Sequence, residues 1–176
     1  HELSSEGLDY LQASRRVEAP GASEQSPILV VSLFNGIGGA FRSYDAVGVL
    51  PMGRIAVECN AGANRITLRR WPGTLIVEDV KLVDRIMVGS WSRKFLRVQE
   101  VHLWAGFPCT DLSSAKFGRE NLSGTNSSLF WEIPRIKKLI KEEFGESVVV
   151  KSAVENVASM DESACREISE ALEAVP

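Results

Sequence analysis

Residues 30–41 read VVSLFNGIGGAF, an apolar run that leads into a cluster of glycines and then into a helix-like segment. The apolar residues predict a buried strand, and the glycines predict the turn that joins this strand to a helix. Glycine lets the backbone come close to a ligand, and the first turn of a helix offers unpaired N–H groups. The spacing is G-x-G-G and not the G-x-G-x-x-G of dinucleotide sites. Taken alone, the stretch supports a tight strand-to-helix turn and a ligand site equally.

The rest of the chain continues this alternation of strand and helix patterns. The expected strands are 28–34, 54–58, 74–77, 101–105 and 148–154, and the expected helices are 40–47, 61–71, 83–90, 129–141 and 162–172. Such alternation predicts an α/β fold built on a mostly parallel sheet with flanking helices. Residues 1–27 have the composition of an N-terminal extension and linker, so the folded domain is expected to span residues 28–176.

Composition and charge narrow the class of protein. The chain has 176 residues, of which 44% are hydrophobic, enough for one domain with a core. A formal charge of -3 gives no global basic surface, so charge neither supports nor excludes a nucleic-acid partner. Three cysteines and two histidines without paired spacing favour reduced thiols and no metal site. No run approaches the roughly 20 apolar residues of a membrane span, and no signal-peptide core is present. We therefore expect an intracellular protein without a membrane partner.

One cysteine follows the fourth expected strand. Cys109 lies in the stretch WAGFPCTDLS at residues 104–113, where a Gly-Phe-Pro turn presents it beyond the carboxyl edge of the sheet. Chemistry in α/β proteins is placed at that edge. Most free cysteines are small buried side chains, so Cys109 alone favours a structural role over a nucleophile.

Acidic residues follow three other expected strands. Glu58 lies 19 residues after Gly39 (58 minus 39), where nucleotide-binding folds place an acid that binds ribose hydroxyls; the alternative is a solvated strand end. Asp79 could reach an adenine amino group, although capping the next helix is the commoner role. Glu155, with Asn156 beside it, is either a surface residue or a carboxyl group with a specific task. The glycine turn and Glu58 together favour an adenosine-type cofactor.

Three motifs in this order resemble the family of DNA (cytosine-5) methyltransferases. They are FNGIGG at residues 34–39, GFPC at 106–109 and ENV at 155–157, and the resemblance extends from about Ile28 to the end of the chain. Within that family, PCTDLS at 108–113 and ENVASM at 155–160 are most similar to the animal de novo branch, with similar loops in bacterial and phage enzymes. The resemblance implies a Rossmann-like, S-adenosylmethionine-dependent methyltransferase fold.

The resemblance also implies a chemistry and a set of site residues. The Cys109 thiolate would add to carbon 6 of cytosine, and carbon 5 would then take the methyl group and leave S-adenosylhomocysteine as product. Glu155 would hydrogen-bond the base and supply a proton, while Asn156 would support the cysteine loop and Glu155. The implied cofactor contacts are Phe34, Asn35, Gly36, Ile37, Gly38 and Gly39 near adenosine and methionine, Glu58 with Cys59 near the ribose, Asp79 and Val80 at the adenine, and Gly106 and Pro108 beside the methyl group.

DNA is the implied partner, and a base within a duplex would have to be flipped to reach this site. The polar segment 107–128 would close over the base, with Ser113, Lys116 and Arg119 as candidate nucleic-acid contacts. Solvated loop charge is the alternative for Lys116 and Arg119. A basic stripe on the helix 129–141 could face DNA, but we favour the solvent-exposed face of a helix; its members are Arg135, Lys137, Lys138 and Lys141.

The chain departs from the family after Asn156, which only 20 residues follow (176 minus 156). A Gln-x-Arg-x-Arg motif and a target-recognition region are expected there in relatives, so the chain resembles the amino-terminal catalytic half of a fold that is incomplete at its carboxyl end. It would be a fragment, one subunit of a split enzyme whose second chain supplies the missing half, or an inactive module that binds cofactor or a partner. RNA remains an alternative substrate, and a nicotinamide-dependent oxidoreductase is disfavoured by the glycine spacing. The expected compartment is the nucleus in a eukaryote, or the cytoplasm or nucleoid in a bacterium or phage host.

Overall fold

The computed structural model describes residues 25–108, 127–156, 160 and 162–173. Within these residues, five parallel strands form one sheet in the order β3-β2-β1-β4-β5. The strands are β1 (Ser26–Leu33), β2 (Pro51–Val57), β3 (Leu75–Val77), β4 (Glu100–Gly106) and β5 (Val149–Glu155). The predicted parallel α/β architecture is therefore confirmed. Cys109, Ser113, Lys116 and Arg119 lie outside the described residues.

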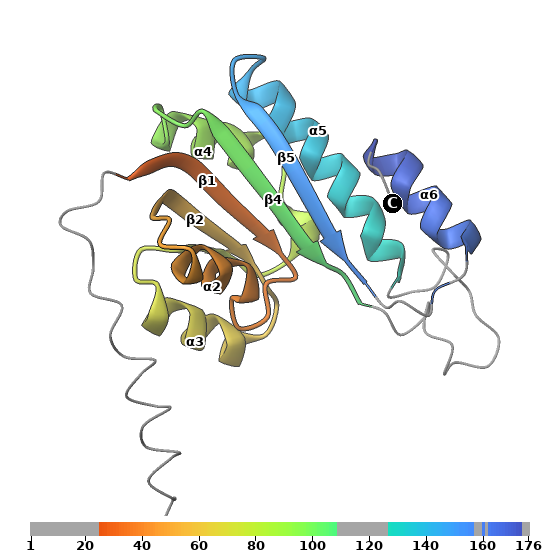
Figure 1. The fold of residues 1–176 in the computed structure, drawn as a ribbon, viewed down its shortest axis with the longest axis horizontal. Coiled ribbons are helices and arrows are strands. Elements are labelled where there is room, and N and C mark those ends of the chain that lie inside the picture. The colour runs from red at the N-terminus through yellow and green to blue at the C-terminus, as the bar shows by residue number, and fades with distance from the viewer. Residues whose placement is uncertain (1–24, 109–126, 157–159, 161, 174–176) are drawn as a thin grey trace, which may run out of the picture.

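Helices flank both faces of the sheet (Figure 1). The helices are α2 (Gly39–Ala46), α3 (Ala61–Arg70), α4 (Arg85–Lys94), α5 (Glu132–Phe144) and α6 (Glu162–Leu172), with short 3-10 turns η1 (Val80–Leu82) and η3 (Ser127–Trp131). The side chains of α2 and the end of α3 build a small core on one face, and α4, α5 and α6 contribute to a larger core on the other. Both layers are needed because parallel strands are normally buried on both faces.

The strand order reverses at β1, which pairs with β2 on one side and β4 on the other. At this reversal the connecting helices leave to opposite faces of the sheet and open a crevice at the carboxyl ends of the strands. The predicted site residues follow these ends: Phe34 after β1, Glu58 after β2 and Asp79 shortly after β3, while Gly106 ends β4 and Glu155 ends β5. The topology thus brings residues that are far apart in the sequence together at one edge of the sheet.

The expected element boundaries differ from the observed ones by up to four residues in two helices, and β2 begins at Pro51 rather than at residue 54. The segment predicted as one helix, 129–141, is divided into η3 and α5. Pro134 explains the division, because proline lacks an N–H and fits a helix only in its first turn. The helix predicted at 83–90 is observed as α4, which begins at Arg85 because the Asp84 carboxylate caps it by accepting the Met87 N–H at 2.7 Å.

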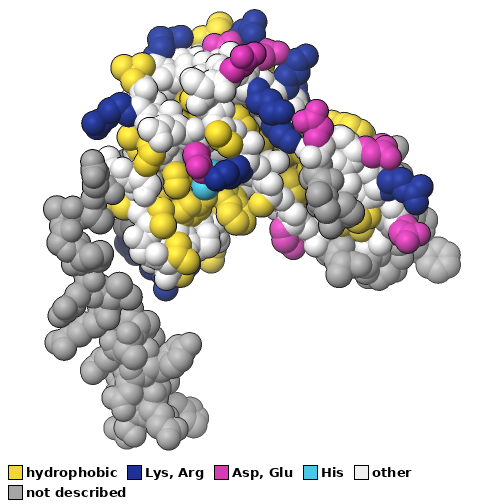
Figure 2. All heavy atoms as spheres, turned by 45° about the horizontal axis from the view of Figure 1, so that its top comes forward, with side chains coloured by type: hydrophobic (Ala, Val, Ile, Leu, Met, Phe, Trp, Pro, Cys, Tyr) yellow, Lys and Arg dark blue, Asp and Glu magenta, His cyan; other side chains and the backbone are white. Residues whose placement is uncertain are grey.

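The α2-side face of β4 and β5 is more open than the rest of the sheet. Along β5 the side chains of Val149, Lys151, Ala153 and Glu155 are exposed, alternating with half-buried ones that face the larger core. Figure 2 shows hydrophobic side chains around a histidine that has an acidic and a basic neighbour. His102 Nε2 lies 2.7 Å from the Glu100 carboxylate, which also accepts a hydrogen bond from Lys151. No helix among the described residues is long and apolar enough to cross a membrane.

Candidate cofactor and catalytic site

The glycine turn after β1 has a backbone that most residues avoid. Phe34 has a φ of 54°, Gly36 of 54° and Gly38 of 90°, all in the left-handed region. A Cβ atom on Gly38 would lie 2.3 Å from Cζ3 of Trp71, whose ring packs against the turn. Glycine is therefore required at position 38 for conformation and for space. A non-glycine residue such as Phe34 in this region is uncommon, and such residues concentrate at functional sites.

Glu58 ties the glycine turn to the start of α3. Its Oε2 accepts the Gly36 N–H at 2.8 Å, and its Oε1 accepts the Asn60 N–H at 2.8 Å. The backbone carbonyl of Glu58 accepts a hydrogen bond from Asn64 Nδ2 at 2.7 Å. A carboxylate has about four lone-pair directions, so each oxygen keeps one for a hydroxyl donor. Glu58 is therefore an ordered acceptor at the predicted ribose position rather than a freely solvated strand end.

A buried cluster of three polar side chains, Asn35, Asn64 and Thr67, packs beneath the glycine turn, between that turn and α3. Asn35 is 6% exposed and its Nδ2 donates to Thr67 Oγ1 at 3.0 Å. Thr67 is fully buried and Asn64 is 7% exposed. Among the described residues, the buried Oδ1 atoms of Asn35 and Asn64 have no hydrogen-bond partner. A buried acceptor without a partner is costly. Asn35 lines the hollow described below, whereas Asn64 does not.

Asp79 and Val80 begin the turn that follows β3. Asp79 Oδ1 accepts the Lys81 N–H at 2.9 Å, so the capping role considered for this residue is present. Val80 is 6% exposed and packs in the larger core. The guanidinium of Arg135 in α5 donates to the carbonyl of Val80 at 3.1 Å and to that of Val83 at 2.6 Å.

A hollow of about 380 Å³ lies at the carboxyl ends of β1, β4 and β5. This volume lies within the range of small-molecule sites. Five predicted site residues line it: Phe34, Asn35, Gly39, Gly106 and Glu155; its other described lining residues are Ser32, Leu33, Ala40, Trp104, Ala105, Ala153 and Val154. Glu58, Asp79 and Val80 are not among the residues that line this hollow, and they lie further along the edge at the ends of β2 and β3.

The end of β5 is joined to the segment that leads to Cys109. Asn156 Nδ2 donates to the carbonyl of Phe107 at 3.0 Å. Glu155 pairs in register with Gly106, and a Cβ atom on Gly106 would lie 3.3 Å from Glu155 Oε2. Glu155 is exposed, so its carboxylate faces solvent at the mouth of the hollow.

An aromatic pair holds Phe107, the residue bound by Asn156, in the core. The ring of Phe107 is 3% exposed and lies 5.3 Å, centroid to centroid, from the fully buried ring of Phe130. Phe107 comes just before residues 109–126, and Phe130 comes just after them, so the pair joins the two ends of the segment that contains Cys109. Apart from the apolar character of its two members, nothing in the amino-acid sequence predicts this pair.

The remaining predicted contacts are more peripheral. Ile37 is 65% exposed, and Cys59 is an exposed free thiol. Pro108 is half-buried and is the last described residue before the segment 109–126. Asn64, Thr67 and Trp71 were not predicted, although a polar pair three residues apart on the buried face of a helix is a signal that could have identified Asn64 and Thr67.

The prediction that the basic stripe of α5 is a solvent-exposed face is wrong for Arg135 and Lys137. Arg135 binds the turn at Val80, and Lys137 donates to the carbonyl of Leu172 at the end of α6. Burial lowers the pKa of Lys137. Lys138 is exposed, in agreement with the prediction. Long basic side chains can lie along a helix and bind carbonyl groups of neighbouring elements, which the helical period alone does not reveal.

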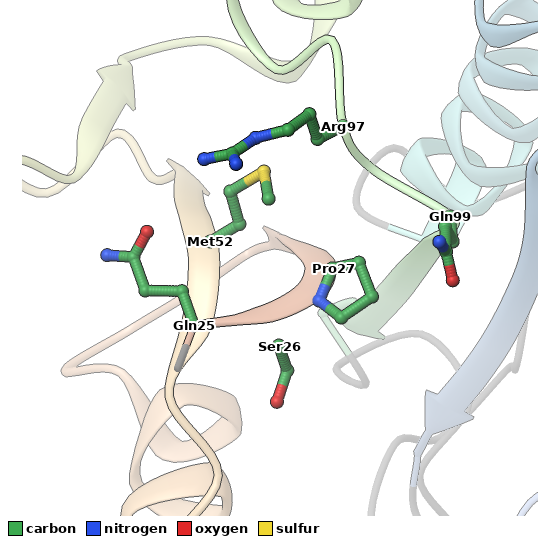
Figure 3. Close-up of a pocket in the computed structure, with 6 residues that line it drawn as sticks. All are labelled: Gln25, Ser26, Pro27, Met52, Arg97 and Gln99. Atoms are coloured by element: carbon green, nitrogen blue, oxygen red, sulfur yellow. The ribbon is translucent and has the colours of Figure 1, made fainter. Parts of the chain in front are cut away.

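A second hollow, of about 490 Å³, lies at the opposite edge of the sheet (Figure 3). It is lined by residues at the amino ends of β1, β2 and β4: Gln25, Ser26, Pro27, Met52, Arg97 and Gln99. None of the predicted site residues lies there. In the part of the chain that is described, no three His, Cys, Asp or Glu residues are grouped so that they could hold a metal ion.

The fold is that of a doubly wound α/β protein with a hollow at the switch point between β1 and β4, where ligands bind in such folds. A DNMT2 from Spodoptera frugiperda has the same fold, with a TM-score of 0.55 and 19% identity over 82% of this chain and 40% of that chain. The Entamoeba histolytica methyltransferase EhMeth gives a TM-score of 0.57 and 18% identity over 86% of this chain and 44% of its own. The Rossmann-like methyltransferase fold is therefore confirmed.

Sequence comparisons identify the family. The model of the C-5 cytosine-specific DNA methylase family matches residues 28–170. Two relatives from Oryza sativa subsp. japonica are the DNA (cytosine-5)-methyltransferases DRM2, 34% identical, and DRM1A, 33% identical, each over 119 residues or 64% of this chain. The chain belongs to the C-5 cytosine-specific DNA methylase family. It spans 19% of the length of DRM2 and 24% of that of DRM1A.

Proposed function

We propose that this chain forms the cofactor-binding and catalytic part of an enzyme that transfers a methyl group from S-adenosylmethionine to carbon 5 of cytosine in DNA. The observation that carries the proposal is the junction of β4 and β5 at the carboxyl edge. There Asn156 binds the carbonyl of Phe107, two residues before Cys109, and Glu155 lies beside Gly106. A nucleophile and an acid on adjacent strands can act on the same base.

The residues at the edge fit S-adenosylmethionine, which when bound supplies an electrophilic methyl group on a sulfonium. Glu58 offers ordered acceptor oxygens for ribose hydroxyls, and the buried Oδ1 of Asn35 lacks a donor among the described residues. The glycine turn brings backbone close to the hollow without Cβ atoms in the way. Asp79 and Val80 stand at the predicted adenine end, and Gly106 borders the predicted methyl position.

In the proposed reaction the Cys109 sulfur forms a bond to carbon 6 of cytosine, which makes carbon 5 nucleophilic. Glu155 donates a proton to the ring nitrogen as electron density moves onto the base. After carbon 5 has taken the methyl group, the ring nitrogen returns its proton to Glu155. A water molecule then takes the proton from carbon 5 as the sulfur–carbon 6 bond breaks, which restores the aromatic ring and the thiolate. Asn156 holds the segment that contains Cys109 through the Phe107 carbonyl, so it is a positioning residue.

DNA binding is part of this proposal, with the target base flipped out of its duplex. Ser113, Lys116 and Arg119 remain the predicted contacts to nucleic acid. Because the chain spans less than a quarter of its curated relatives, we propose that target recognition requires a further segment or a second chain. The proposed substrate implies an intracellular site of action, the nucleus in a eukaryote. Residues 28–176 remain the predicted domain, preceded by the predicted extension 1–27.

The test is covalent trapping on DNA that contains 5-fluorocytosine. Fluorine at carbon 5 cannot leave as a proton, so the protein should remain bound to the base in the presence of S-adenosylmethionine. Cys109→Ala should abolish the adduct, whereas Cys165→Ala, which removes a free thiol in α6, should retain it. An adduct that survives Cys109→Ala would disprove the covalent mechanism.

A second candidate is a module that binds cofactor or a partner without catalysing methyl transfer alone. The exposure of Glu155, whose carboxylate faces solvent, favours it. It predicts binding of S-adenosylhomocysteine together with no adduct on 5-fluorocytosine DNA. The trapping experiment and a binding titration therefore separate the two functions.

A further inference from the structure

Arg135 makes an unusual set of contacts for a residue on the polar side of a helix. Its Nη1 donates to the Val83 carbonyl at 2.6 Å, and its Nη2 donates to the Val80 carbonyl at 3.1 Å. Its Nε donates at 2.7 Å to Glu132 Oε2, which Nη2 also contacts. The side chain is 38% exposed, so the fork lies partly within the protein.

These contacts hold both ends of the turn that follows β3. Val80 starts η1, Val83 follows its end, and both side chains are buried in the larger core. The carboxylate of Asp79 caps the amino end of the same turn. Arginine suits this task because its planar guanidinium can donate to two carbonyls at fixed angles, whereas a lysine ammonium is a single point charge.

The orientation of the guanidinium is itself fixed by Glu132, one turn earlier in α5. Glu132 is the first residue of α5, which begins directly after η3. One side of the guanidinium is therefore occupied by a carboxylate from α5, and the other side by two carbonyls from the turn after β3. The contact joins the turn at Asp79 and Val80 to the helix that follows the Cys109 segment in the chain.

We infer that Arg135 is a positioning residue for the adenine end of the cofactor site, acting through the backbone of Val80 and Val83. The inference rests on the proposed function, because Asp79 and Val80 are the residues proposed at the adenine. Arg135 does not itself contact the cofactor in this assignment. It keeps the turn in one conformation, so that binding does not have to order it.

A matched control exists on the neighbouring helix. Arg85 in α4 binds α5 through Glu142 at 2.7 Å and Glu143 at 2.8 Å. Its side chain is 64% exposed and its ion pairs connect two helices without touching the Val80 or Val83 carbonyls. Arg85→Ala therefore removes an arginine that anchors α5, as Arg135→Ala does, but leaves the turn after β3 intact.

The experiment measures S-adenosylhomocysteine affinity by calorimetry and thermal unfolding for the full 176-residue chain and for Arg135→Ala, Arg135→Lys and Arg85→Ala. We expect Arg135→Ala to weaken binding about tenfold, the effect of losing one or two charge-assisted hydrogen bonds. Arg135→Lys should give an intermediate loss, and Arg85→Ala should bind as the unaltered chain does. Equal affinities for Arg135→Ala and Arg85→Ala would overturn the inference.

Hydrogen exchange without ligand provides a second readout. Arg135→Ala and Arg135→Lys should speed the exchange of the amides of residues 81–84, while Arg85→Ala should not. Unchanged exchange there would overturn the inference even if affinity fell. If the unaltered chain does not bind S-adenosylhomocysteine, the proposed function fails, and the assignment of Arg135 to a cofactor site fails with it. Normal binding by the unaltered chain and by Arg135→Ala would leave the proposed function standing and reject the inference alone.

Discussion

The glycine turn depends on single residues in two different ways. At Gly38 the backbone is left-handed and the Trp71 ring occupies the space of a side chain, whereas at Gly36 the backbone is left-handed but no atom lies within 4 Å of a Cβ position. The two sites therefore separate the conformational cost of a side chain from its steric cost.

We predict that Gly38→Ala lowers the free energy of unfolding by about 2–4 kcal/mol, because left-handed strain and overpacking add. Gly36→Ala should cost only about 1–2 kcal/mol, the strain alone. Urea denaturation of both variants measures the difference. Equal losses would mean that Trp71 moves away without cost.

At Glu58 the shape of the carboxylate group is as important as its charge. Both oxygens accept backbone N–H groups, so Glu58→Gln must turn its NH₂ toward one of these donors. We expect a loss of about 1–3 kcal/mol in unfolding free energy and weaker binding of S-adenosylhomocysteine. Asp84→Asn is the control, because Asp84 caps α4 away from the predicted cofactor contacts and asparagine caps a helix about as well as aspartate does. If Glu58→Gln changes neither the free energy of unfolding nor the affinity for S-adenosylhomocysteine, the described role of Glu58 is contradicted.

The sequence was sufficient to place Glu58 at the edge of the sheet but not to predict what it binds. Strand ends follow from apolar periodicity, and the position of an acid follows from counting residues. The hydrogen bonds from Gly36 and Asn60 depend on the left-handed turn and on the packing of α3, which are tertiary features. For the same reason Thr67 and Trp71 were missed, although they support the turn.

At the scale of elements, the expected strands and helices all occur, and the errors have local causes. Pro134 moved the start of α5, and the Asp84 cap set the start of α4. The basic residues of α5 were wrongly treated as one solvent-exposed face, because a helical period shows which residues share a face but not which carbonyls come within reach of it. Cys109 lies outside the described residues, so its role remains a prediction.

Adjacent strands β4 and β5 are joined by an ionic contact that depends on pH. The hydrogen bonds from Lys151 and then His102 lower the pKa of Glu100 below its ordinary value of 4.5. A lowered folded-state pKa means that the stabilisation is present above about pH 4.5 and is lost as the pH falls through the folded value. Glu100 is partly exposed, so we expect at most about 1 kcal/mol.

We therefore predict that Glu100→Gln is less stable than the unaltered chain at about pH 7 and that the gap closes as the pH falls below the lowered pKa of Glu100. Urea unfolding at several pH values measures the difference. Glu146→Gln, at an exposed glutamate before β5, should give no such trend. A stability gap between Glu100→Gln and the unaltered chain that persists in acid would indicate packing rather than ionisation.

At the scale of the whole molecule, β1 belongs to both cores. Val30 and Val31 are both fully buried, but Val30 packs with Phe41 and Trp71 in the smaller cluster and Val31 packs in the larger one with Trp91. The strand also pairs with β2 and β4. Since one strand is shared by two layers and two neighbours, we expect the two layers to unfold together.

We predict that Val30→Ala and Val31→Ala each cost about 1–3 kcal/mol and that each lowers the stability of both faces. Two reporter variants test this, one keeping only Trp71 and the other only Trp91, with the remaining tryptophans replaced by phenylalanine. In each valine variant, the fluorescence transitions of the two reporters should coincide with each other and with the loss of helical circular dichroism, as in a two-state unfolding. Separate transitions would mean that the small core around α2 unfolds independently, and the site at the β1–β4 switch point would then lose its glycine turn before the rest of the domain unfolds.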